Sequence, residues 1–217
     1  MPAEDSSATA SEMRRYLRLL GGRACLDFAN TVEPRIGQRQ RDFLLSYTDL
    51  VTWAEFAGMI ARAEARRLLA QCAQQPQQAA QAFRKAIKLR ELIYRLFVAI
   101  ATGEPPKAAD LRALQTIHIN ALRHAELRPN RDGFTWQWSE DTDDLERIGW
   151  LLAQSAIELL TSPQVGRVKM CASPDGCGWL FLDTSKNGSR RWCSMEVCGS
   201  RAKMRRLYAR RRKQAHT

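Results

Sequence analysis

The stretch that decides the fold of this chain lies near its C-terminal end and reads CASPDGCGWLFLDTSKNGSRRWCSMEVC, residues 171–198. Its four cysteines form two pairs, with five residues inside the first pair, four inside the second and fifteen between the pairs. Zinc is held by four soft ligands in a tetrahedron, and two turns of chain that each supply two thiolates satisfy this geometry. The pattern therefore predicts one structural Zn²⁺ per chain, bound by Cys171, Cys177, Cys193 and Cys198.

The residues around these cysteines predict the local structure of a small zinc module. A Pro-Asp-Gly-Cys-Gly turn at residues 174–178 is suited to a metal-binding knuckle. Residues 179–183 and 190–193 read as the strands of a β-hairpin around an Asn-Gly turn. Ser194 is suited to cap the helix that follows. We expect a knuckle, a β-hairpin and a basic helix, similar to a treble clef.

Upstream of the module the sequence predicts helices, so the expected fold class is mainly α. The longest begins at Pro76, ends at Gly103 and carries apolar residues on two faces, which is typical of a central helix in a bundle. Residues 134–138 alternate in polarity and read as a short strand. Further helices are expected at residues 48–57, 61–73, 107–126 and 143–160.

Breaks in these patterns suggest three regions. Residues 1–13 are small, polar and unpatterned, which is typical of disorder. Residues 14–165 form the expected helical domain, a candidate for ligand sensing or dimerisation. The turn signals Pro163 and Gly166 mark the boundary with the zinc module, residues 166–217, and we expect the helical domain to fold without that module.

The charge of the chain is concentrated in the zinc module. The net charge is +11, yet residues 161–217 hold 13 of the 34 basic side chains and only 3 of the 23 acidic ones. Such asymmetry points to a polyanionic partner for the last segment. A solvated basic tail is the alternative.

The helix after Ser194 carries most of these cations. At about 100° per residue, Arg201, Arg205 and Arg212 share one side, while Met204 and Leu207 point another way and could pack on the hairpin. Arginine on such a helix can contact phosphates and guanine edges. The candidate nucleic-acid contacts are Arg190, Arg191, Arg201, Lys203, Arg205, Arg206, Arg210 and Arg212.

Three segments of the module resemble the CGNR zinc finger. They are WLFLD at 179–183, RRWCSM at 190–195 and CGSRAK at 198–203. The upstream domain resembles the ABATE domain that precedes this finger, through GG at 21–22, LDFANTV at 26–32 and LVTW at 50–53. The resemblance runs from about residue 17 to residue 212.

The resemblance implies a stress-induced bacterial transcription regulator whose helical domain senses a signal. The four zinc ligands of the family correspond to the same four cysteines. Ser200 stands where the family name has asparagine, which leaves the target preference of this chain open.

A second candidate site is a polar cluster, Asp27 and Asn30 with Arg35 nearby, which could hold a small-molecule effector. A helix cap with internal hydrogen bonds is the alternative for these residues. Cys25 and Cys72 lie in apolar helical contexts and read as inert core thiols.

Three classes of function remain open: a DNA-binding regulator, which we favour, a zinc-stapled protein-interaction adaptor and an RNA-binding protein. We do not expect an enzyme, because four thiolates leave zinc no open position for catalysis. No secretion signal and no membrane-spanning run are visible, so we expect a cytoplasmic bacterial protein without a membrane partner, nucleoid-associated if it binds DNA. A homodimer is compatible with the sequence.

Overall fold

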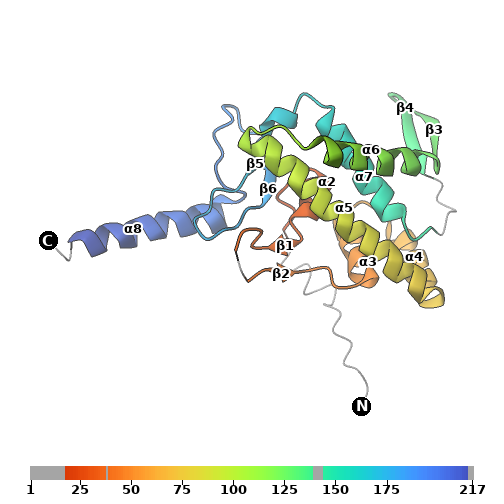
Figure 1. Ribbon diagram of the computed structural model, residues 1–217, viewed down its shortest axis with the longest axis horizontal. Helices are drawn as coiled ribbons and strands as arrows, with labels where there is room; N and C mark the ends of the chain where they lie inside the picture. The colour runs from red at the N-terminus through yellow and green to blue at the C-terminus, as the bar shows by residue number, and fades with distance from the viewer. Residues whose placement is uncertain (1–17, 38, 139–143, 215–217) are drawn as a thin grey trace, which may run out of the picture.

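The computed structural model describes residues 18–37, 39–138 and 144–214, and side chains as far as Ala209. These residues are mainly α-helical, as expected (Figure 1). The helices are α2 (Ala24–Ala29), α3 (Tyr47–Phe56), α4 (Arg62–Gln74), α5 (Pro76–Thr102), α6 (Ala108–Leu122), α7 (Arg147–Leu160) and α8 (Ser200–Gln214). Two short helical turns, η1 (Val165–Arg167) and η2 (Met195–Gly199), lie in the last segment. The region expected to be disordered, residues 1–13, lies outside the described residues.

The strands form short antiparallel pairs rather than one sheet. Within the described part of the chain, β1 (Val32–Glu33) pairs with β2 (Arg41–Asp42), β3 (Ala125–Asn130) with β4 (Gly133–Trp138), and β5 (Val168–Met170) with β6 (Leu180–Leu182). None of the described helices is long and apolar enough to cross a bilayer.

Helix α5 is the centre of the helical domain, which confirms the reading of its two apolar faces. It starts with Pro76 in the first turn and ends at Gly103, whose φ of 80° closes the helix in the left-handed conformation. Along its length it contacts α2, α3, α4, α6 and α7 as well as β5 and β6 (Figure 1). Leu89, Ile93 and Phe97 are buried in the core that these elements enclose.

The region after α6 differs from the expectation of one helix to residue 126. The helix ends at Leu122, and β3 follows it as the first strand of a hairpin with β4. Trp138 provides the physical reason, because its indole is buried against Ala121 and Trp150 and its Nε1 donates to the carbonyl of Ala121 at 3.2 Å. The strand read at residues 134–138 is confirmed, with Phe134 exposed.

The expected strand pairing in the zinc module is wrong in one detail. β6 pairs with β5, upstream of the knuckle, instead of with residues 190–193. The returning chain is fastened by the buried carboxylate of Asp183, which accepts hydrogen bonds from the amides of Ser185 and Arg190 at 3.0 Å each and from Lys169 Nζ at 2.8 Å. The hydrogen bonds of the Asp183 side chain therefore hold the returning chain in place of the backbone hydrogen bonds of a paired strand.

The zinc module and the helical domain share a hydrophobic core. Val168, Leu180 and Leu182 belong to the same buried cluster as the helices. The side chain of Asn30 joins α2 to β6 through a pair of hydrogen bonds, each 2.8 Å, to the amide and the carbonyl of Leu180. Separate folding of residues 14–165 would leave these groups uncovered, and the boundary at residue 166 stays a prediction.

We predict that Asn30→Ala lowers the free energy of unfolding by about 2 to 4 kcal/mol, because it leaves two buried backbone groups of Leu180 without partners. Chemical denaturation followed by circular dichroism would measure this loss. Asn187→Ala, in the exposed turn of the module, should change stability by less than about 0.5 kcal/mol. Equal effects of the two substitutions would contradict the role given to Asn30.

Candidate metal centre

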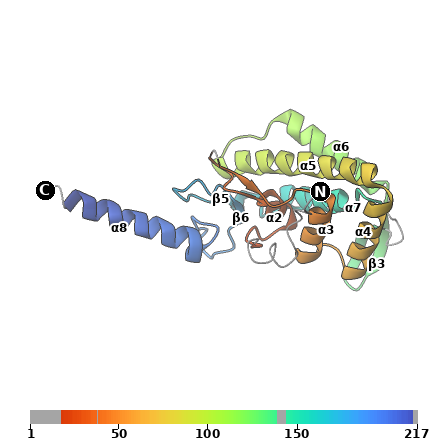
Figure 2. The same ribbon diagram turned by 90° about the horizontal axis from the view of Figure 1, so that it is seen from below.

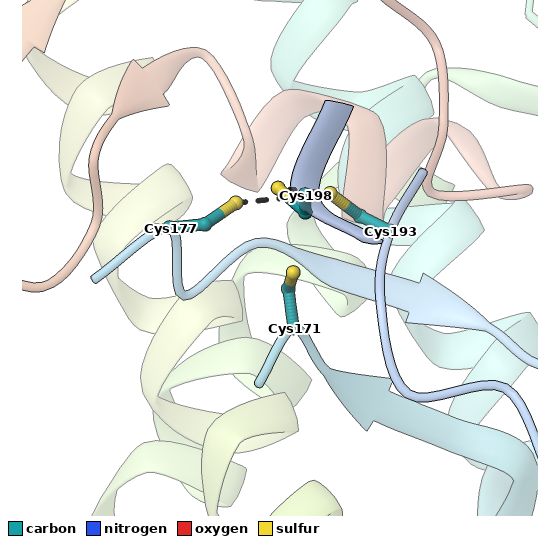
Figure 3. Close-up of side chains that lie close together, drawn as sticks. All are labelled: Cys171, Cys177, Cys193 and Cys198. Carbon is teal, nitrogen blue, oxygen red and sulfur yellow. Dashed lines mark hydrogen bonds between the residues drawn. The ribbon is translucent and has the colours of Figure 1, made fainter. Parts of the chain in front are cut away.

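Four cysteines from four different places in the module meet at one point. Cys171 directly follows β5, Cys177 lies in the knuckle, Cys193 precedes η2 and Cys198 lies within η2. All four are buried, and their sulfur atoms lie within 4.8 Å of one another. Figure 3 shows the four side chains directed toward a common centre.

The spacing of the sulfurs fits zinc. Cys193 Sγ lies 3.7 Å from Cys177 Sγ and 3.7 Å from Cys198 Sγ. A tetrahedral ion with Zn–S bonds of about 2.3 Å has sulfur–sulfur edges of roughly 3.8 Å. A disulfide would need about 2.05 Å. The residues thus form a site for one structural zinc ion, with every coordination position filled by the protein.

Hydrogen bonding within the cluster favours ionisation of one thiol. Hydrogen bonds from Cys177 and Cys193 lower the pKa of Cys171, which makes it the first thiol to ionise. The same hydrogen bonds raise the pKa of Cys177 and Cys193, because each then holds its proton for Cys171. Without a metal the cluster favours a single thiolate, and a divalent ion offsets the repulsion among four of them.

The knuckle is pressed against the helical domain at two glycines. Gly176 and Gly178 have φ values of 75° and 63°, which L side chains rarely adopt. A Cβ atom on Gly176 would lie 2.3 Å from the carbonyl oxygen of Ile36. This close approach allows the amides of Arg35 and Ile36 to donate to the carbonyls of Cys177 and Gly176, at 2.8 and 3.0 Å respectively.

Two aromatic side chains that the sequence analysis did not single out for this role hold the same region. Trp179 Nε1 donates to the carbonyl of Val32 at 2.9 Å, and Tyr94 Oη donates to the carbonyl of Gly178 at 3.0 Å. Trp179 belongs to a motif segment, but Tyr94 on α5 lies 83 residues before the second ligand, Cys177. No local sequence signal could have linked Tyr94 to the knuckle.

The remaining two cysteines lie apart from the cluster. Cys25 is fully buried in α2, and burial raises the pKa of its thiol to about 12. Its sulfur donates to the carbonyl of Ser155 at 3.6 Å. Cys72 lies in α4 and packs on the edge of the helical core. Both positions fit core thiols.

The three residues considered for an effector site lie in the interface between the helical domain and the module. Asp27 Oδ1 accepts from the amide of Gly21 at 2.7 Å, and Asn30 binds Leu180. Arg35 Nε donates to the carbonyl of Ala29 at 2.6 Å, while its Nη1 pairs with Glu91 at 2.8 Å. These contacts are internal hydrogen bonds and a turn cap, the alternative reading of the cluster, and its use by an effector stays a prediction.

The candidate nucleic-acid residues divide into two groups. Arg191, Arg201, Lys203 and Arg206 are exposed. Arg190 instead lies over the Phe181 ring and donates to the carbonyls of Trp192 and Cys193, so its guanidinium supports the metal centre.

The remaining candidates are also on α8. Arg205 donates to the carbonyl of Pro174 at 2.9 Å and pairs with Asp175 at 3.1 Å. The side chains of Arg210 and Arg212 lie outside the described part of the helix.

Comparisons with known proteins match two families to successive segments of the chain. Residues 22–163 match the ABATE family model, described as "Putative stress-induced transcription regulator". Residues 167–211 match the CGNR zinc finger. A comparison with curated proteins gave no match. The two matched segments meet at residues 164–166, next to the boundary expected from the sequence.

We predict one zinc per chain in protein purified without chelator, and its loss in Cys193→Ser. Zinc binding contributes the folding free energy of small thiolate modules, so the variant should also lose helical signal from the last segment. Metal analysis and circular dichroism would measure both. Cys72→Ser should retain the metal. Zinc well below one equivalent in the wild-type protein would contradict the assignment.

Asp27 makes the free energy of unfolding depend on pH. Burial raises the pKa of its carboxyl to about 6, against the hydrogen bond from Gly21, which lowers it. The folded protein therefore holds this proton more tightly than the unfolded chain. The stability that protonation contributes is present below about pH 4 and is lost as the pH rises through 6.

We predict that Asp27→Asn, which keeps an acceptor for Gly21, removes this dependence. Relative to wild type, its free energy of unfolding should rise by at most about 3 kcal/mol between pH 4 and pH 7. Denaturant titrations across that range would measure the difference, in which the shared pH dependence of zinc binding cancels. Parallel pH curves for the two proteins would show that Asp27 does not titrate as described.

Proposed function

The chain belongs to the ABATE family, with a CGNR zinc finger as its second part, and from that premise we propose that it is a transcription regulator that binds duplex DNA through α8. The observation that carries the proposal is the exposure of this helix. Figures 1 and 2 both show α8 extending away from the rest of the protein, with most of its circumference uncovered. A helix displayed in this way has the dimensions to enter a major groove.

The side of α8 that faces the module is fixed. Ala202 is buried, and Arg205 is tied to the carbonyl of Pro174 and the carboxylate of Asp175. The expectation that Met204 and Leu207 would pack on the hairpin is wrong, because these side chains are 44% and 40% exposed. The small side chain of Ala202 permits the close approach, and this anchor sets the direction of the helix.

Three exposed cations of α8 are not neutralised by the protein. Among the described residues, Arg201, Lys203 and Arg206 have no ion-pair partner. Unpaired arginine and lysine on an exposed helix release counterions from DNA when they contact its phosphates. In this proposal zinc is a structural ion that stabilises the module. The protein has no catalytic role in it. We propose that it works in the reducing cytoplasm, where the thiolates stay available to the metal.

We predict that Arg201→Ala/Lys203→Ala/Arg206→Ala weakens binding to duplex DNA and flattens its salt dependence. Because each of these side chains neutralises one phosphate in the proposed complex, the slope of log K against log salt should change by roughly 2.7. Fluorescence anisotropy between 50 and 200 mM salt would measure it. The matched control is Arg66→Ala/Arg112→Ala/Arg131→Ala, which removes three exposed cations outside α8 and should leave the slope unchanged. Equal slopes for the two triple variants would contradict DNA binding through α8.

One observation supports the adaptor as a second candidate. Met204, Leu207 and Tyr208 form an exposed apolar strip on the same helix, 40% to 57% accessible. Apolar strips on cationic helices also dock into grooves of partner proteins. Met204→Gln/Leu207→Gln should leave DNA binding within about twofold if DNA is the main ligand. Tighter binding to single-stranded or duplex RNA than to DNA at equal salt would favour the RNA-binding alternative.

A further inference from the structure

A cavity of about 450 Å³ lies between α5, α6 and α7, and none of the three residues first considered for an effector lines it. Its walls are mainly apolar and come from Leu50, Leu89, Leu92, Ile117, Leu145 and Trp150. Volumes of 300 to 1,000 Å³ with apolar walls and few polar groups are usual for small-molecule sites. The Trp150 indole is held in place by His124, whose ring stacks on it at 4.1 Å.

A glycine in the first turn of α7 lies beside the cavity. Gly149 lines the cavity, and a Cβ atom built on it would meet no described heavy atom within 4 Å. Its φ is not positive, so the backbone does not require glycine. Glycine is less favourable than alanine within a helix. The described neighbours do not require glycine at this position, and the lack of a side chain leaves the space beside it open.

The rim of the cavity is cationic. Lys85, Lys88 and Arg95 line it from α5, and the one acidic residue among the described lining residues is Glu146, which pairs with Lys85. Arg95 is paired with Asp110 on α6 at 2.8 Å. Lys88 has no hydrogen bond or ion pair to any described residue. An apolar body in the cavity would thus place a terminal anionic group beside an ammonium that lacks a counterion.

We propose that this cavity binds an amphipathic anion, a small molecule with an apolar chain or ring and one carboxylate-type group that pairs with Lys88. The apolar walls bind the body of the molecule, and the cationic rim selects its charge. The site does not depend on the proposed DNA binding, because its ligand contacts α5, α6 and α7 and none of α8.

Isothermal titration calorimetry on the full-length, zinc-loaded protein tests the site with octanoate as the probe. We expect saturable binding of octanoate and none of acetate, which has the charge without the chain. Decanoate should bind more tightly by about fourfold per added methylene that the cavity buries. Gly149→Leu adds a side chain beside the cavity at a position where a Cβ atom is accommodated, and it exchanges glycine for a strong helix former. It should keep or raise the melting temperature while abolishing octanoate binding.

The choice of an anion is tested separately. Lys88→Met should weaken octanoate binding by about fivefold to tenfold and leave the binding of 1-octanol unchanged. Lys107→Met, which removes one exposed lysine outside the cavity, is the matched control and should leave both affinities as they are. If Lys88→Met and Lys107→Met had equal effects, or if octanol bound as tightly as octanoate, the anionic ligand would be excluded. Octanoate binding that survives Gly149→Leu would overturn the site itself.

Discussion

The structure of the last quarter of the chain depends on four thiolates held about one zinc ion. Its regular elements are too small to be stable alone, because β5 and β6 have three residues each and η2 is a single turn. Four sulfurs that lie within 4.8 Å of one another join the end of β5, the knuckle, the chain before η2 and η2 itself. Metal binding supplies the free energy that so short a segment cannot obtain from burial.

The zinc module in turn completes the helical domain. Leu180 and Leu182 fill the core beside α2 and α5, and Asn30 satisfies the backbone of β6 from the helical side. The knuckle fits against the chain at Ile36 only because residues 176 and 178 have no side chain. A core that crosses the boundary between the two family segments couples their stability, so metal loss would be felt in both.

Helix α5 carries different chemistry on its two sides. One side presents Tyr94 to the knuckle and Arg90 to the β1–β2 region, where Arg90 pairs with Asp42 at 2.6 Å. The other presents Leu89, Leu92 and Lys88 to the cavity. The same helix therefore contacts both the metal-bound module and the proposed ligand, within one rigid element of 27 residues. Its two-faced apolar pattern is the sequence property that made this position in the fold predictable.

The sequence by itself determined the features that depend on neighbouring residues. The four zinc ligands follow from cysteine spacing and turn residues, the helices follow from apolar periodicity, and the cap at Ser194 follows from its hydroxyl, which accepts from the amide of Val197. The cationic character of α8 is likewise a property of composition. The family could be recognised from the same local motifs, since they surround the metal ligands.

Only the tertiary structure decided what depends on residues far apart in the chain. It paired β6 with β5, because Asp183 fastens residues 185–190 and leaves β6 free for the upstream strand. It turned Arg190 and Arg205 toward carbonyl groups of the module, and left Met204 and Leu207 in solvent. It also opened the cavity beside Gly149. Contacts between side chains depend on the distances between them in the folded protein. For residues far apart in the chain, the sequence alone does not contain these distances.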